Sequence, residues 1–198
     1  MPDPIRQAAS VAVFCGSRFG VKAAYTEAAR ATGEGLARAG IRLIYGGGKV
    51  GLMGVLADAA IAAGGQVSGV IPHFLSAREV MHEHVADLTV TDSMHSRKQR
   101  MFAGADAFLV LPGGLGTFDE AIEIITWRQL RLHDKPIVIV DIDGWARTLL
   151  AIVENAIDDG FADPSARALF SIATSVEAAL AQLRTVRTEA ASADIERL

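Results

Sequence analysis

The stretch AFLVLPGGLGTFDEAIEIITWRQL, residues 107–130, carries the clearest fold signal in this 198-residue chain. It opens with consecutive apolar residues over Ala107–Leu111, which is typical of a parallel strand buried on both faces. A glycine-rich loop follows, and the remainder has the apolar spacing of an amphipathic helix over Thr117–Leu132. A strand, a glycine loop and a helix in this order predict one unit of an α/β sheet.

The same alternation extends in both directions along the chain. Short apolar runs predict further strands at Val11–Cys15, Ile41–Tyr45, Gln66–Ile71, Asp87–Val90 and Pro136–Val140. Ala- and Leu-rich segments with one polar side predict helices at Ala23–Ala39, Met53–Ala63, Met94–Ala103 and Gly144–Asp159. We therefore expect an α/β, Rossmann-like open parallel sheet with helices on both faces. Residues 1–198 should form a single domain, with residues 185–198 as a weakly ordered tail.

Composition limits which cellular compartment and which kinds of binding partner the protein is expected to have. The net charge of −4 and the isoelectric point near 5.7 argue against a protein that coats nucleic acid, because such proteins carry a basic excess. The sequence shows neither a signal-peptide pattern nor an apolar run of about 18 residues, the length that spans a membrane. The single cysteine, Cys15, suits a reducing compartment and is expected to be a small packing residue. We expect a cytoplasmic protein without nucleic-acid or membrane partners.

Three predicted strand-to-helix loops are rich in glycine or small residues: CGSRFG at 15–20, GGGKVGLMG at 46–54 and PGGLGT at 112–117. Such loops let backbone amides approach a phosphate at a helix N-terminus. The second loop contains a GxGxxG pattern, but the next strand ends without the acidic residue that would hold a ribose hydroxyl. This disfavours an NAD-dependent oxidoreductase. For Gly51 and Gly54, close packing of helix on sheet is at least as good an explanation as ligand binding.

The third loop leads into a candidate catalytic carboxylate. Thr117 is a natural helix N-cap and Glu120 stands three residues later, which matches a capping box. Glu120 is therefore either a cap or a carboxylate that acts on a ligand. Upstream, MHSRKQRM at 94–101 places Arg97 and Lys98 in one helix. These two residues are either a solvated helix face or the cations needed where a carboxylate lies beside an anion-binding loop.

Together, MHSRKQRM and PGGLGTFDE resemble the paired motif of the Lonely Guy (LOG) family, the cytokinin-activating phosphoribohydrolases. The segments FCGS, YGGGKVGLMG, GVIPHFL and ITWRQLRLHDKP agree with the same family. The resemblance implies a Rossmann-like fold and a homodimer with active sites near the subunit interface. It also implies hydrolysis of an N6-substituted adenosine 5′-monophosphate, or of AMP itself, to the free base and ribose 5-phosphate. Members are often labelled lysine decarboxylases, but no lysine here lies in a recognisable pyridoxal phosphate site.

The resemblance also assigns site residues by position. Arg97 and Glu120 match the catalytic pair. The positions that match nucleotide contacts are Lys98, Gly113, Gly114, Gly116 and Thr117, with Glu79 and Thr126 as further contacts. The segment SAREVMHEHV departs from the usual pattern after Glu79, which leaves the substrate preference open.

Cofactors and metals are not expected. His82 and His84 are spaced for one face of a strand, but no third ligand is evident in the sequence. The alternative to an enzyme is a non-catalytic nucleotide- or cofactor-binding carrier. The presence of both Arg97 and Glu120 favours the enzyme, because a carrier gains nothing from a carboxylate beside a phosphate.

Overall fold

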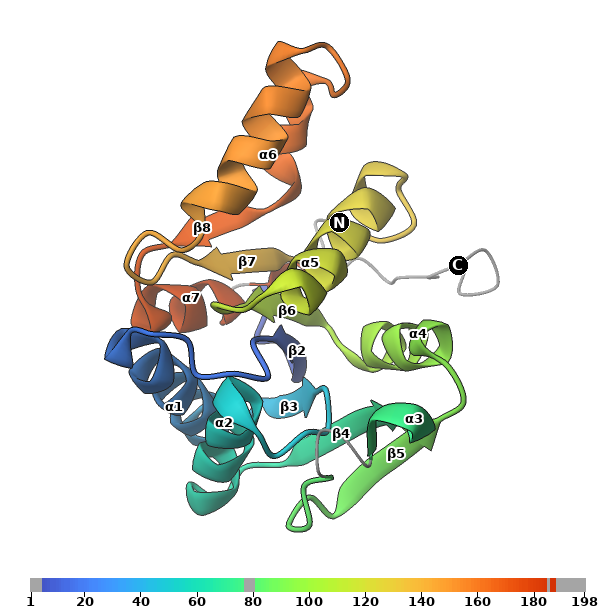
Figure 1. Ribbon diagram of the computed structural model, residues 1–198. Helices are drawn as coiled ribbons and strands as arrows, with labels where there is room; N and C mark the ends of the chain where they lie inside the picture. The colour runs from blue at the N-terminus through green and yellow to red at the C-terminus, as the bar shows by residue number, and fades with distance from the viewer. Residues whose placement is uncertain (1–4, 77–80, 185, 188–198) are drawn as a thin grey trace.

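The computed structural model describes residues 5–76, 81–184 and 186–187. Seven strands form one open sheet in the order β5-β4-β3-β2-β6-β7-β8, and every neighbouring pair in it is parallel (Figure 1). A separate antiparallel pair joins β1 to β9. Among the described helices, none has the length and apolar character needed to cross a bilayer. The predicted α/β, Rossmann-like fold is confirmed.

The predicted strands and helices differ from the observed ones by less than a helical turn at either end. The strands are β1 (Ile5–Arg6), β2 (Ser10–Phe14), β3 (Arg42–Tyr45), β4 (Val67–Pro72), β5 (Asp87–Thr91), β6 (Ala107–Val110), β7 (Ile137–Val140), β8 (Ser171–Ala173) and β9 (Val186–Arg187). The helices are α1 (Ala23–Arg38), α2 (Gly51–Ala62), α3 (His73–Ser76), α4 (Met94–Gly104), α5 (Leu115–Gln129), α6 (Arg147–Asp158), the 3-10 helix η1 (Pro164–Leu169) and α7 (Val176–Leu183).

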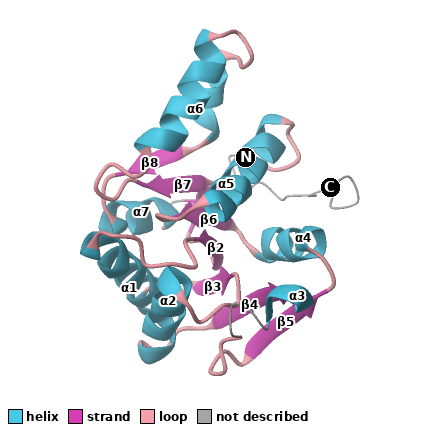
Figure 2. Cartoon of the chain, viewed as in Figure 1, coloured by secondary structure: helices cyan, strands magenta, loops and turns pink. Residues whose placement is uncertain are grey.

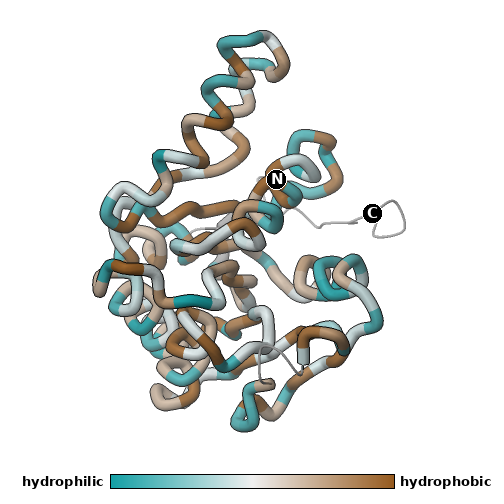
Figure 3. Tube along the Cα trace, viewed as in Figure 1, coloured by the Kyte–Doolittle hydropathy of each residue, from teal (hydrophilic) through white to brown (hydrophobic). Residues whose placement is uncertain are grey.

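Helices cover both faces of the sheet, as Figure 2 shows. Alternate residues of each strand enter different cores: Val11 and Val13 pack with α1, α2 and α7, whereas Phe14 packs with α4, α5 and α6. Figure 3 shows the matching hydropathy, with hydrophobic stretches along the central strands and a hydrophilic α4. Burial on both faces explains why the strands are apolar throughout.

The strand order fixes the position of the ligand site. From β2 the chain builds the sheet outward through β3, β4 and β5, then returns to the other side of β2 with β6, β7 and β8. The switch point of the sheet therefore lies between β2 and β6. Crevices at such points, beside the carboxyl ends of the strands, are where open α/β sheets bind ligands. The first and third glycine loops leave β2 and β6 at this crevice.

The C-terminal part of the described chain contains elements that the sequence patterns did not predict. Strand β8 has three residues and helix α7 has eight, too few to produce a clear period. Of the predicted tail at 185–198, the structure describes only Val186–Arg187, which form β9. The rest of that segment lies outside the described residues.

The predicted capping box is wrong. Helix α5 begins at Leu115, so its N-cap is Gly114 and no side chain caps it. Thr117 lies against Gly113, where an alanine Cβ would be 2.0 Å from its Oγ1, so only glycine leaves room for that hydroxyl. Thr117 is therefore buried in the first turn. Glu120 lies in the second turn, facing inward, and is not the residue that closes the cap.

Candidate active site

A cavity of about 650 Å³ opens at the carboxyl ends of β2 and β6. Its walls come from the first glycine loop, the third glycine loop, the first turn of α2 and side chains of α4 and α5; these residues include Cys15–Gly20, Leu52, Met53, Arg97, Pro112–Thr117, Asp119, Glu120 and Trp145. Cavities that hold small ligands have volumes of roughly 300–1,000 Å³. The space is thus sufficient for a nucleotide.

Arg97 and Glu120 form a buried ion pair in the wall of this cavity. Nη1 of Arg97 donates to Oε1 of Glu120 at 3.0 Å, and the two residues are 6% and 8% exposed. Arg97 is anchored further by Nε, which donates to the carbonyl of Val70 at 3.0 Å, and by Nη2, which donates to Gly46. The guanidinium is thus fixed by the ends of two strands. The Glu120 carboxylate therefore lies in the cavity wall with the Arg97 guanidinium as its counter-ion.

Gly46 makes room for that arginine. An added Cβ at this position would lie 2.3 Å from Nη2 of Arg97 and 2.9 Å from Sδ of Met53. The first glycine of the GxGxxG pattern therefore leaves the space in which the Arg97 guanidinium lies beside Glu120. Gly51 has a φ of +62° and lies against the backbone of Ser17 and Arg18, so close packing explains this glycine as well. This is the close packing considered for Gly51, but against the first glycine loop rather than between helix and sheet.

The helix N-termini at the cavity differ in what they offer an anion. In the first turn of α2, the amides of Leu52 and Met53 donate to the carbonyl of Gly16 and are already used. The first turn of α5 has no side-chain cap, and Gly114, Leu115 and Gly116 are exposed. A helix N-terminus carries roughly half a positive charge, so α5 offers the better anion site.

Trp145 positions the third glycine loop. Its Nε1 donates to the carbonyl of Gly113 at 3.0 Å, and its ring stacks on Phe118 at 5.3 Å between centroids. On the other side of the loop, the amide of Gly16 donates to the carbonyl of Pro112. The loop is thus held from both sides. Trp145 was not predicted as a site residue, since it lies beyond β7 and matches no motif.

Lys98 is not part of the cavity lining, unlike its neighbour Arg97. Its Nζ donates to Glu123 at 3.0 Å and to Asp119 at 3.2 Å. Burial lowers the pKa of Lys98, but the hydrogen bonds to these two carboxylates outweigh it, so the pKa is raised overall. Asp119 does line the cavity. Lys98 is therefore connected to the cavity through its hydrogen bond to Asp119.

The remaining predicted contacts differ in position. Gly113, Gly114, Gly116 and Thr117 all line the cavity. Thr126 is exposed on α5 and is not part of the lining, and Glu79 lies outside the described residues. Arg18 is an additional lining residue, on the exposed first loop. Only the residue type could have suggested Arg18, because a guanidinium beside a small-residue loop is a common partner of phosphate.

Cys15 is buried and lines the cavity. Burial, and to a lesser extent the charge of Glu120, raise the pKa of its thiol far above the usual range. A thiol that stays protonated is a poor nucleophile. The prediction that Cys15 is a packing residue is confirmed, since it belongs to the buried core.

Comparison with known proteins identifies the family. A protein-family model described as "Possible lysine decarboxylase" matches residues 53–183. A cytokinin riboside 5′-monophosphate phosphoribohydrolase of Arabidopsis thaliana is 42% identical over 179 residues, covering 90% of this chain and 82% of the relative. A second Arabidopsis thaliana phosphoribohydrolase of the same name is 42% identical over 167 residues, covering 84% of this chain and 78% of that relative.

The chain belongs to the Lonely Guy (LOG) family. Solved structures support the fold of this LOG protein. A molybdenum cofactor binding protein from Rippkaea orientalis superposes with a TM-score of 0.68 at 20% identity, covering 91% of this chain and 97% of that one. The molybdenum cofactor carrier protein from Chlamydomonas reinhardtii gives a TM-score of 0.66 at 21% identity, covering 88% and 96%. At such identities these likenesses concern the fold alone.

The decarboxylase description does not fit the cavity of this LOG protein. Amino-acid decarboxylation of the common kind uses pyridoxal phosphate, held as a Schiff base by a lysine. Among the described lining residues there is no lysine. The amine of the half-buried Lys135 donates to the carbonyl of Phe102, on the α4 and α5 side of the sheet. The residues present do not suit pyridoxal phosphate.

Proposed function

We propose that this LOG protein hydrolyses the N-glycosidic bond of N6-substituted adenosine 5′-monophosphates, including cytokinin riboside 5′-monophosphates. Water adds to C1′ of the ribose, the bond from C1′ to N9 breaks, and the base leaves with a proton. The products are the free base and ribose 5-phosphate. The buried Arg97–Glu120 pair beside an uncapped helix N-terminus is the observation that carries this proposal. The named function of the Arabidopsis thaliana relatives agrees with it.

In this proposal the third glycine loop binds the 5′-phosphate. Gly113, Gly114, Gly116 and Thr117 would supply backbone amides and a hydroxyl at the start of α5. Arg18, on the facing loop, would add a guanidinium to the same anion. Because a helix N-terminus and a cation both favour negative charge, the phosphate would orient the ribose toward Glu120.

Glu120 is the proposed catalytic carboxylate. Breaking the glycosidic bond develops positive charge on the ribose, as in glycoside hydrolysis. A carboxylate beside C1′ can stabilise that charge or take the proton of the attacking water. Arg97 would hold Glu120 in position and face the departing base. Lys98 would act on the nucleotide through Asp119, which it holds at the cavity wall.

The apolar part of the wall would take the base and its N6 substituent. Phe19, Tyr25, Leu52, Met53 and Leu75 contribute apolar surface to the cavity. An apolar substituent removed from water gains roughly 25 cal/mol for each Å² that is buried. We therefore propose that an N6-prenylated nucleotide is a better substrate than AMP.

A substrate panel tests this function. The protein is incubated with N6-isopentenyl-AMP, with AMP and with adenosine, and release of free base is measured. The proposal expects the highest kcat/KM for the prenylated nucleotide, and little turnover of adenosine because it leaves the phosphate site empty. Equal turnover of adenosine and AMP would contradict the phosphate assignment. Tight binding of the nucleotides without any release of base would favour a non-catalytic carrier instead.

We also propose that the protein works in the cytoplasm, without nucleic-acid partners, as a homodimer. The acidic net charge and the single buried cysteine support the first two points. Leu130 is 64% exposed at the end of α5, one helical turn beyond the exposed Thr126. In a dimer formed through this surface, Thr126 would lie at the subunit interface near an active site. Light scattering of Leu130→Glu should show a monomer where the unmodified chain is a dimer; an unchanged mass would exclude this surface.

A further inference from the structure

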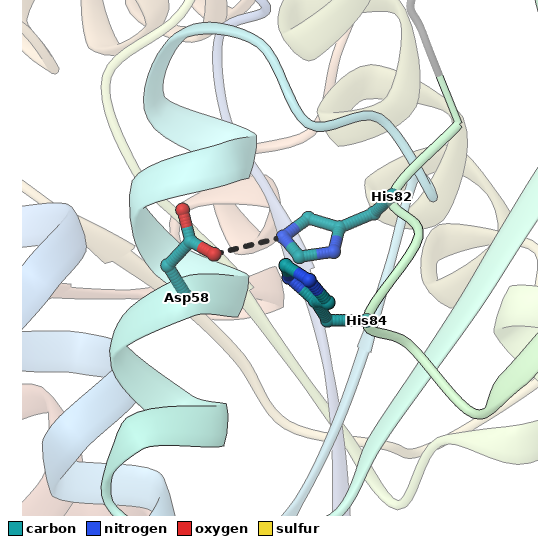
Figure 4. A group of neighbouring side chains, drawn as sticks. All are labelled: Asp58, His82 and His84. Carbon is teal, nitrogen blue, oxygen red and sulfur yellow. Dashed lines mark hydrogen bonds and ion pairs between the residues drawn. The ribbon is translucent and has the colours of Figure 1, made fainter.

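A second cluster of chemically active side chains lies away from the nucleotide cavity. Asp58 projects from α2, and His82 and His84 project from the segment that leads into β5 (Figure 4). One ligand atom from each side chain can be chosen so that all lie within 4.8 Å of one another. None of the three residues lines the nucleotide cavity. The spacing of the two histidines alone could not reveal the third residue, which comes from another element.

His82 is the best-defined member of the cluster. Its side chain is 3% exposed, and Nε2 lies 3.1 Å from Oδ1 of Asp58. Its backbone amide donates to the carbonyl of Gly47, and the adjacent Met81 forms a bridge with Gly48. The backbone at His82 is therefore held against the second glycine loop.

Unsatisfied polar atoms concentrate at this place. Within the described part of the chain, two buried side-chain atoms have no hydrogen-bond partner: Nδ1 of His82 and the hydroxyl of Tyr45. Asp58 is close enough to Tyr45 to interact with it electrostatically, and it pairs with Nε2 of His82, not with the unsatisfied Nδ1. Buried polar groups are nearly always satisfied, and a group that is not calls for a water or an ion. Because Nε2 and Nδ1 point to different sides of the ring, an ion beside Asp58 would be bound by Nε2, while Nδ1 would carry the ring proton and donate to a water.

We propose that Asp58, His82 and His84 bind one divalent transition-metal ion, for which zinc is the best match. Two imidazoles and a carboxylate are a donor set typical of zinc, which takes three protein ligands and a water. Ligand atoms at about 2.0–2.1 Å from a tetrahedral ion lie roughly 3.3 Å apart. The 3.1 Å between His82 and Asp58 already meets this spacing. His84 is exposed and can swing inward to complete the site.

The bound ion would tie two parts of the nucleotide site together. Asp58 lies on α2, whose first turn presents Leu52 and Met53 to the cavity. His82 is bonded to the glycine loop that leads into the same helix. A metal ion between Asp58 and His82 would therefore link α2 to the segment that is bonded to the second glycine loop. Its main effect is expected on stability rather than on the chemical step.

Zinc binding to the metal-free, tag-free full chain tests the proposal by calorimetry. We expect one zinc ion per chain and a rise in the thermal midpoint when zinc is added. His84→Ala and Asp58→Asn should each lower the zinc affinity at least about tenfold and abolish the rise. Both positions are exposed, so the fold is retained, and Asn can still accept a hydrogen bond from His82.

His73→Ala is the matched control, because it removes an exposed histidine outside the cluster. Its zinc affinity and thermal shift should equal those of the unmodified chain. Absence of saturable zinc binding would overturn the proposal. So would an affinity that His84→Ala and Asp58→Asn leave unchanged, since that result would place the ion elsewhere. Neither outcome depends on nucleotide hydrolysis.

Discussion

Substitution of Gly46 by alanine tests whether the position of Arg97 controls activity. The added Cβ would lie 2.3 Å from Nη2 of Arg97 and 2.9 Å from Sδ of Met53. Since carbon atoms pack at about 3.5–4.0 Å, the guanidinium must move by about 1 Å. That movement would disturb its 3.0 Å contact with Glu120.

A displacement of this size in a catalytic group costs on the order of 100-fold in rate. We therefore expect Gly46→Ala to lower kcat/KM for N6-isopentenyl-AMP by about 100-fold, equivalent to about 2.7 kcal/mol of transition-state stabilisation. The thermal midpoint should fall by several degrees, because crowding at this buried position costs about 1–3 kcal/mol, so the rate is measured well below the midpoint. Steady-state kinetics and thermal unfolding are measured on the same preparation.

Gly104→Ala is the control for this substitution. Gly104 ends α4, the helix that carries Arg97, and its added Cβ would meet only Cδ1 of Ile44 at 3.0 Å. Its kcat/KM should stay within about twofold of the original, because the guanidinium is not touched and alanine suits a helix. If folded Gly46→Ala retained full activity, the reasoning that links the exact place of Arg97 to catalysis would fail.

Two further predictions follow from neighbouring contacts. Trp145→Phe removes the hydrogen bond to Gly113 but keeps an aromatic ring stacked on Phe118. Loss of a hydrogen bond worth about 1 kcal/mol should raise KM roughly five- to tenfold and leave kcat little changed. A lower kcat at constant KM would argue against a loop-positioning role. His133 accepts from the amide of Lys135 and lies 2.9 Å from the carbonyl of Ile124, and burial lowers its pKa to about 4. In the unfolded chain His133 takes up a proton near pH 6.5, whereas in the native chain it stays neutral down to about pH 4. The free energy of unfolding should therefore fall by roughly 2–3 kcal/mol as the pH drops from 6.5 to 4. Urea unfolding of His133→Gln should show a weaker pH dependence, and an unchanged slope would contradict this origin.

The sequence predicted the sheet well because its signal is local. Strands such as Ala107–Val110 are buried on both faces and stay apolar throughout, so their period needs no tertiary information. The short β8 and α7 were not predicted, because their stability comes from packing against β7 and α1 rather than from a long pattern. The start of α5 was misplaced because threonine is a favoured N-cap residue, whereas Thr117 is buried inside the first turn against Gly113, a contact that only the three-dimensional arrangement shows.

The site was predicted in part. The meeting of Arg97 and Glu120 was expected from the paired motif, and the two side chains do form an ion pair. The role of Gly46 was missed, because a steric requirement between a loop and a distant helix leaves no mark on local sequence. Trp145 was missed likewise, as was the closeness of Asp58 to two histidines 24 and 26 residues further along.

The central claim, that Glu120 is the catalytic carboxylate, is tested most directly by Glu120→Gln beside Glu123→Gln. Both residues lie on α5, but Glu123 pairs with Lys98 and is not part of the cavity lining. A glutamine at 120 can still accept from Arg97, so we expect a stability loss of only about 1–2 kcal/mol. The measurement is kcat for base release from N6-isopentenyl-AMP. The account predicts that Glu120→Gln loses at least about 100-fold while Glu123→Gln stays near the original rate. A folded Glu120→Gln protein that releases base at an undiminished rate would contradict it.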